Sequence, residues 1–166
     1  MGRADRLRSP GQPAVRARLL IVEDDPALAA VLEEFLGESF TVVRTGRGDE
    51  ALRLAARTPF DLILTDIVLP GADGRAILRR FVGDPARTLV ILMTGYSGIA
   101  DATEAVAEGA WDFISKPFAL PELQVRLANA HRYQQALRRI QALEQELAEA
   151  SRWARSGLRA YAGGEP

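Results

Sequence analysis

Short runs of apolar residues alternate, over the first 120 positions, with longer segments whose apolar residues recur every three or four places. A short apolar run bounded by turn residues predicts a buried strand, and the wider spacing predicts an amphipathic helix. Five strands are expected, at residues 19–22, 40–43, 62–64, 89–93 and 111–114. Strands that alternate with helices form a parallel sheet with right-handed crossovers, so the pattern predicts a doubly wound α/β fold with helices on both faces.

Local residues indicate where the helices between these strands begin and end. Asp25 is a good N-cap, Pro26 suits the first helical position, and Gly37 is expected to stop that helix. Three further helices are expected over residues 48–58, 74–81 and 99–108. The last of these is rich in alanine and acidic residues and has little apolar surface, so we expect it to be a mobile element.

The last segment, from Pro121, meets no helix-breaking residue before Gly157. It predicts one helix of about 35 residues, or about 50 Å at a rise of about 1.5 Å per residue. Over residues 131–157, apolar and small residues alternate at spacings of three and four, as in a coiled-coil seam. They are Tyr133, Ala136, Ile140, Leu143, Leu147, Ala150 and Ala154. This extension fits both a homodimer through the helix and a solvated helical linker, and residues 158–166 are expected to be a flexible end.

Composition and charge exclude several classes of protein. The chain has no cysteine, so it holds neither disulfides nor thiolate metal sites. No apolar run approaches the roughly 20 residues needed to span a bilayer, and the arginine-bearing residues 1–17, expected to be a disordered basic tail, lack the apolar core of a secretory signal. Residues 19–120 hold 16 acidic against 9 basic residues, which argues against direct nucleic acid binding. A cytoplasmic protein is expected.

Polar residues follow four of the predicted strands at their carboxyl ends. They are Glu23 and Asp24, Asp66, Thr94 and Lys116. The carboxyl ends of parallel strands meet at one edge of the sheet, where open α/β sheets bind their ligands. Three carboxylates that meet there repel one another unless a cation lies among them, and Mg²⁺ prefers such oxygen ligands. A lysine and a hydroxyl nearby suit a phosphoryl group, so the cluster predicts phosphoryl transfer onto a carboxylate. Taken alone, Asp66 fits equally well as a cap of the next helix.

Residues from about 18 to 130 resemble the receiver domain of bacterial two-component response regulators. The matching residues are Glu23-Asp24, Asp66 in the run of residues 66–74, Thr94-Gly95 and Lys116-Pro117. The resemblance implies a flavodoxin-like fold of strand order 2-1-3-4-5 over residues 18–130, followed by the helical or coiled-coil extension. It also implies a phosphorelay signalling domain, and not an enzyme that acts on other substrates.

The resemblance further implies a role for each charged residue. Asp66 would accept the phosphoryl group from a sensor histidine kinase or a histidine phosphotransfer protein, giving an aspartyl phosphate. Asp24, Asp66 and the backbone carbonyl of Val68 would bind Mg²⁺, and Glu23 would hold a metal-bound water. Lys116 would offset the charge that develops on the phosphoryl oxygens.

The same resemblance implies a switch that responds to the phosphoryl group. Thr94 would move toward it, and Phe113 would swing into the space that Thr94 leaves. Phe113 lacks the phenolic hydroxyl of many relatives, so this switch would work by packing alone. Val68 and Tyr96 flank the access of solvent to the phosphoryl group, and their size predicts a long-lived phosphoaspartate. The Lys116–Pro117 bond is expected to be cis.

Other interpretations of the pattern fit the residues less well. A dinucleotide-binding domain needs glycines after the first strand, where this chain has Glu23-Asp24-Asp25. A haloacid-type phosphatase needs a carboxylate at the position of Val68. His131, the single histidine, is expected to be an exposed surface residue. Three outputs stay open: a stand-alone receiver that controls a protein or dimer contact, a phosphorelay intermediate, and the regulatory part of a longer protein.

Overall fold

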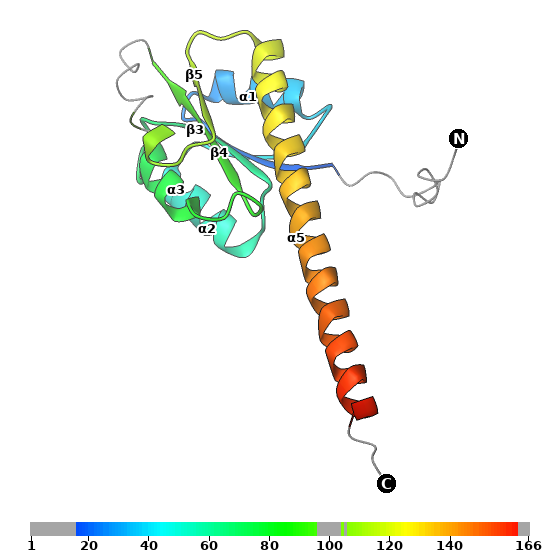
Figure 1. The fold of residues 1–166 in the computed structure, drawn as a ribbon. Helices are drawn as coiled ribbons and strands as arrows, with labels where there is room; N and C mark the ends of the chain where they lie inside the picture. Colours follow the sequence, from blue (N-terminus) through cyan, green and yellow to red (C-terminus); the bar gives the residue numbers. More distant parts are fainter. Residues whose placement is uncertain (1–15, 96–103, 105, 163–166) are drawn as a thin grey trace, which may run out of the picture.

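The computed structural model describes residues 16–95, 104 and 106–162. Five parallel strands form one sheet in the order β2-β1-β3-β4-β5, which confirms the predicted doubly wound fold (Figure 1). The strands are β1 (Arg18–Val22), β2 (Thr41–Thr45), β3 (Leu62–Asp66), β4 (Leu89–Thr94) and β5 (Asp112–Ser115). The helices that lie wholly within the described residues are α1 (Pro26–Leu36), α2 (Gly48–Arg57), α3 (Gly74–Phe81) and α5 (Leu120–Ala162).

Two of the expected segments lie wholly or largely outside the described residues. They are residues 1–15 of the N-terminal tail and most of the helix expected over residues 99–108, of which residues 104, 106 and 107 are described as helical. Arg16 and Ala17 are described: the Arg16 guanidinium donates to the carbonyl of Gly37 at 2.9 Å, and Ala17 is buried. Among the described residues, none of the helices combines the length and apolar character that crossing a membrane requires.

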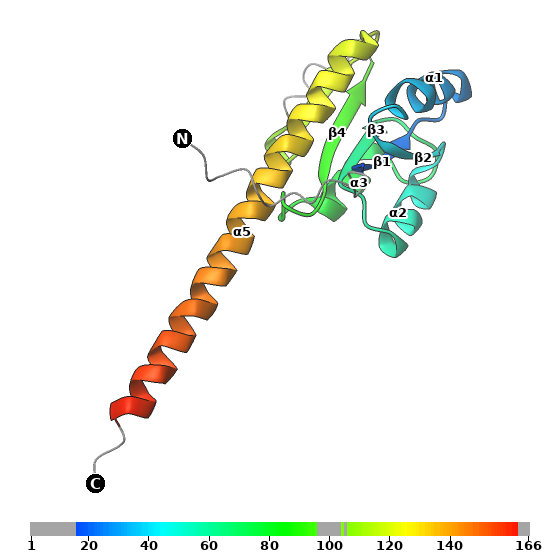
Figure 2. The ribbon, with the colours of Figure 1, turned by 90° about the vertical axis from the view of Figure 1, so that its right-hand side faces the viewer.

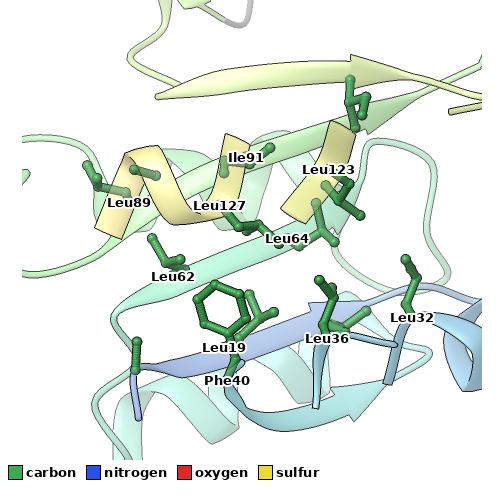
Figure 3. Close-up of a cluster of buried hydrophobic side chains, with 14 of the residues drawn as sticks. Leu19, Leu32, Leu36, Phe40, Leu62, Leu64, Leu89, Ile91, Leu123 and Leu127 are labelled. Atoms are coloured by element: carbon green, nitrogen blue, oxygen red, sulfur yellow. The ribbon is translucent and has the colours of Figure 1, made fainter. Parts of the chain in front are cut away.

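Helices α1 and α5 cover one face of the sheet, and α2 and α3 cover the other (Figure 2). Successive residues of a strand point to opposite faces, so Leu19 and Ile21 of β1 join one core and Leu20 joins the other. Figure 3 shows Leu123 and Leu127 of α5 among the side chains of β3 and β4. Burial of each such side chain contributes about 1.5–3 kcal/mol to the free energy of folding. The packed sheet therefore holds the residues at its two ends in fixed positions.

Helix α1 begins as its sequence predicts. The Asp25 carboxylate accepts hydrogen bonds from the backbone N–H groups of Ala27 and Leu28, at 2.8 and 3.3 Å. At the other end, Gly37 is the C-cap, and its N–H donates to the carbonyl of Glu33 at 2.9 Å. This helix starts directly after β1, so its cap fixes the direction of the chain as it leaves the carboxyl end of that strand.

Helix α5 is fastened to the amino ends of β3 and β4 by two side chains. Gln134 is fully buried, and its Nε2 donates to the carbonyls of Asp61 and Arg87 at 2.9 and 3.0 Å. The Arg138 guanidinium donates to the Asp61 carboxylate at 2.7 Å and to the carbonyls of Ala86 and Arg87 at 2.6 and 3.0 Å. We call these two residues the clamp. It holds the helix at the edge of the sheet opposite to the strands' carboxyl ends.

Two expectations about α5 are wrong. The helix does not stop at Gly157 but continues to Ala162, into the end expected to be flexible. A single glycine costs a helix about 1 kcal/mol relative to alanine, which is too little to end a helix by itself. His131 is half-buried and not exposed, and its Nδ1 is buried with no hydrogen-bond partner among the described residues. It lies three residues before Gln134 and so shares the helix face that meets the receiver.

The clamp predicts a stability effect that is specific to one arginine of α5. Arg138→Ala removes a charged donor from three acceptors at the sheet edge, and we expect the free energy of unfolding to fall by about 1–2 kcal/mol. The matched control is Arg152→Ala, two heptads further along α5 and exposed, with an expected change within about 0.5 kcal/mol. Urea unfolding followed by circular dichroism, at one protein concentration, measures both. Equal effects of the two substitutions would contradict a clamp.

Candidate functional site

Three carboxylates meet at the carboxyl edge of the sheet. β1 and β3 are neighbours with Val22 opposite Thr65, so the residues that follow, Glu23 and Asp66, lie side by side. Together with Asp24 they offer carboxylate oxygens that all lie within 4.8 Å of one another. Glu23 is buried, Asp66 is half-buried and Asp24 is exposed. The expected convergence of these acids at one edge is therefore present.

The loop after β3 approaches Asp66 so closely that only glycine fits at its end. The N–H of Gly74 donates to the carbonyl of Ile67 at 2.9 Å. A Cβ added to Gly74 would lie 2.2 Å from the carbonyl oxygen of Asp66, far inside contact distance. Asp73, one residue earlier, caps α3 by accepting from the N–H of Ala76 at 2.7 Å. Asp66 is thus not the cap of this helix, and its Oδ1 instead accepts from the N–H of Val68 at 3.1 Å.

Lys116 bridges two of the three carboxylates. Its Nζ donates to Oε2 of Glu23 at 2.6 Å and to Oδ2 of Asp66 at 2.5 Å. Its own N–H donates to the carbonyl of Thr94 at 2.7 Å, and its peptide bond to Pro117 is cis, as the resemblance implies. Burial alone would lower the pKa of Lys116, but hydrogen bonds and charge from Asp66 and Glu23 outweigh it and raise that pKa above its usual value. The ammonium stays charged at neutral pH.

Thr94 and Phe113 lie near each other on one face of the sheet. Thr94 of β4 is paired with Ser115 of β5, and Leu92 with Phe113, so Thr94 and Phe113 are diagonal neighbours on the same side. Thr94 is buried, and its hydroxyl donates to the carbonyl of Gly95 at 3.0 Å. Phe113 is partly buried against the core under α2 and α3. Tyr96, the second residue expected to limit solvent access, lies outside the described residues.

The donor set fits a hard divalent cation better than an anion or a soft metal. Carboxylate oxygens are the ligands that Mg²⁺ prefers, and one of the three acids, Asp24, faces solvent and can be reached. Val68, whose N–H donates to Asp66 Oδ1 at 3.1 Å, is 78% exposed. The site can therefore bind a cation through Asp24 and Asp66, and an anionic group through Lys116, at the same place.

Two features of the site escape reasoning from the sequence alone. One is the direct ion pair of Glu23 with Lys116, because the residues are 93 positions apart and Glu23 was expected only to hold a metal-bound water. The other is the close packing of Gly74 beneath Asp66. A glycine eight residues after a strand-end acid is a signal that could have suggested close backbone approach there.

Comparison with known proteins gives one consistent family. The profile of the response regulator receiver domain matches residues 19–128. Over 110 residues the chain is 43% identical to the transcriptional activator protein PfeR of Pseudomonas aeruginosa. The matched region covers 66% of this chain and 36% of PfeR. It is 36% identical over 111 residues to the cell cycle response regulator CtrA of Brucella abortus (strain 2308), covering 66% and 48%. The chain thus spans about half or less of these relatives' length.

Solved structures show the same similarity. A response regulator receiver domain protein from Clostridium thermocellum superposes with a TM-score of 0.68 at 26% identity, covering 73% of this chain and 98% of that one. Full-length FixJ from B. japonicum superposes with a TM-score of 0.68 at 26% identity, covering 82% and 68%.

The glycine beneath Asp66 predicts a sharp difference between two alanine substitutions. Gly74→Ala forces a Cβ against the Asp66 carbonyl, and we expect the free energy of unfolding to fall by about 3 kcal/mol. Gly46→Ala is the control, because its Cβ would meet its nearest atom, the Glu23 carbonyl oxygen, at 3.6 Å, an ordinary contact distance. Its expected effect is below about 0.5 kcal/mol. Urea unfolding measures both, and a neutral Gly74→Ala would show that the loop is not packed as described.

Proposed function

The chain belongs to the response regulator receiver family, and on that basis we propose that Asp66 accepts a phosphoryl group in a Mg²⁺-dependent reaction. The donor is a phosphohistidine on a sensor histidine kinase or a histidine phosphotransfer protein. The observation that carries the proposal is the contact of Asp66 with Lys116 Nζ at 2.5 Å, within the cluster that Glu23 and Asp24 complete. Receiver domains are signalling modules, and we propose no turnover of any other substrate.

We propose separate tasks for the residues of the site. An oxygen of the Asp66 carboxylate attacks phosphorus; the new O–P bond forms as the P–N bond of the phosphohistidine breaks, and the electron pair of that bond returns to the imidazole nitrogen. The Lys116 ammonium, already beside Asp66, donates to a phosphoryl oxygen and offsets its charge. Asp24, Asp66 and the Val68 carbonyl would hold Mg²⁺, and Glu23 would act through a metal-bound water. Bound there, Mg²⁺ supplies further positive charge to the phosphoryl oxygens.

We propose that the response to phosphorylation passes from Thr94 to Phe113. The Thr94 hydroxyl, which donates to the Gly95 carbonyl in this structure, would turn to donate to a phosphoryl oxygen instead. Phe113, its diagonal neighbour, would follow into the space released. The changed surface then alters a contact with a protein partner or with a second copy. The acidic character of residues 19–120 supports a protein partner over nucleic acid.

Phosphorylation of one carboxylate tests the proposal directly. Incubation with acetyl phosphate and Mg²⁺ is expected to add one phosphoryl group to the wild type, seen as an intact mass increase, and none to Asp66→Asn. The matched control is Asp25→Asn, one residue from the cluster, because asparagine caps a helix as well as aspartate and phosphorylation should persist. Chelation of Mg²⁺ should stop the reaction. A phosphorylated Asp66→Asn variant would refute the assignment.

The lifetime of the phosphoaspartate gives a second prediction. Val68 is apolar, is 78% exposed and follows Asp66 by two residues, and we propose that its side chain hinders an attacking water. Val68→Asn should shorten the lifetime several-fold, because an amide can hold that water, whereas the nearly isosteric Val68→Thr should change it less. Loss of the phosphoryl group after removal of the donor is followed by intact mass. An unchanged lifetime in Val68→Asn would show that Val68 does not limit hydrolysis.

A further inference from the structure

Beyond the clamp, α5 runs out into solvent as a single helix (Figures 1 and 2). From Arg139 to Ala154 every side chain is exposed except Ala142, which is half-buried. Four large apolar residues lie in this stretch: Ile140 is 52% exposed, Leu143 46%, Leu147 69% and Trp153 77%, and the first three fall on the predicted seam. Most helices in proteins are stabilised by packing of an apolar face and not by propensity alone. This stretch therefore lacks, within the described chain, the packing that an apolar face normally has.

The exposed apolar face points away from the receiver. Gln134 and Arg138 lie against the sheet edge, and both fall on one side of α5. At 3.6 residues per turn, Leu143 and Leu147 lie about 140° to 180° around the helix from these two residues. Because the clamp fixes the rotation of the helix, the seam stays directed outward. Tyr133, the first seam residue, packs against Trp111 of the receiver, whereas from Ile140 onward the seam is open to a second helix.

We propose that a second copy of this chain covers the seam, as a parallel two-stranded coiled coil in register. Ile140 and Leu147 occupy the first core position of successive heptads, and Leu143 occupies the other. A β-branched residue at the first position followed by leucine at the second, as at Ile140 and Leu143, favours two parallel strands. The two receivers then lie on the outer sides of the pair, at the same end.

Charge along the seam supports this arrangement. In a parallel coil each Arg139 lies opposite Glu144 of the second copy, and symmetry gives two such pairs. Both side chains are exposed, and neither makes a hydrogen bond or ion pair within the described part of its own chain. Each is thus free to pair across the interface. The dimer does not depend on phosphoryl transfer, so Asp66→Asn is expected to dimerise as the wild type does.

Sedimentation velocity of the full chain over a range of concentrations tests whether a second copy of the chain covers the seam. We expect a dimer for the wild type and for Gln145→Asp, which adds a charge at an exposed outer position of the same helical turn. Leu143→Asp should give a monomer with unchanged phosphorylation of Asp66, because Leu143 belongs to neither core of the receiver. A wild type that stays monomeric, or a Leu143→Asp variant that stays dimeric, would overturn the proposal.

Cross-linking tests the orientation, since the chain has no cysteine of its own. A disulfide needs Cα atoms about 4.4–6.8 Å apart, so Ala150→Cys should cross-link to its counterpart only in the parallel, in-register pair. In an antiparallel pair that layers Ile140 against Leu143, Ala150 of one chain would lie opposite Tyr133 of the other. The two Ala150 residues would then be about 26 Å apart along the helix axis, at about 1.5 Å per residue. Glu149→Cys, on the outer side, is the control that should not cross-link. A dimer without the Ala150→Cys disulfide would overturn the parallel assignment.

A charge exchange tests the proposed ion pairs. Arg139→Glu places like charges opposite Glu144 and should weaken dimerisation severalfold at low salt. Adding Glu144→Arg restores opposite charges in reversed order and should recover it. Failure of the double variant to recover, with the single variant impaired, would show that these two residues do not face each other.

Discussion

The site depends on one cation held between two carboxylates. Glu23 and Asp66 come from neighbouring parallel strands and repel each other at the same edge of the sheet. Lys116, delivered by the end of a third strand, donates to both and offsets that repulsion. The charge of Lys116 is itself secured by the two acids, which raise its pKa despite partial burial. The charges of Glu23, Asp66 and Lys116 therefore stabilise one another at this edge. The Lys116 ammonium can also donate to an incoming anion.

The sheet keeps this balance apart from the rest of the chain. Its central strands β1, β3 and β4 are buried on both faces, so the carboxyl edge and the amino edge are two ends of one rigid body. Chemistry occupies the first edge, and the clamp of Gln134 and Arg138 occupies the second. Helix α5 passes from β5 to the clamp and then leaves the body. Any change at β5 thus has a direct covalent route to the long helix.

The sequence predicted the fold and the cluster because both follow from local pattern. Short apolar runs predict buried strands. When those strands are parallel, the acids that follow them lie at the same edge of the sheet. The clamp was not predictable in this way. Arg138 and Asp61 are 77 positions apart. From the sequence alone, an arginine in a charged helix is expected to face solvent, and only the tertiary structure brings it to the edge of the sheet. Gly157 and His131 were misjudged for a related reason, since propensity and helix position are weak guides where packing decides. The roles of Thr94 and Phe113 stay predictions, because a single structure shows where they lie but not how they move.

Asp66 is tested most directly as the phosphoacceptor by binding of beryllofluoride, which mimics a phosphoryl group on a carboxylate, followed by fluorine NMR. We expect bound fluorine signals for the wild type only when Mg²⁺ is present, and none for Asp66→Ala. We also expect weaker binding by Lys116→Met, because the mimic then loses the ammonium that donates to it. Bound signals that persist in Asp66→Ala, or that form equally well without Mg²⁺, would contradict the claim that this cluster is a phosphoacceptor site.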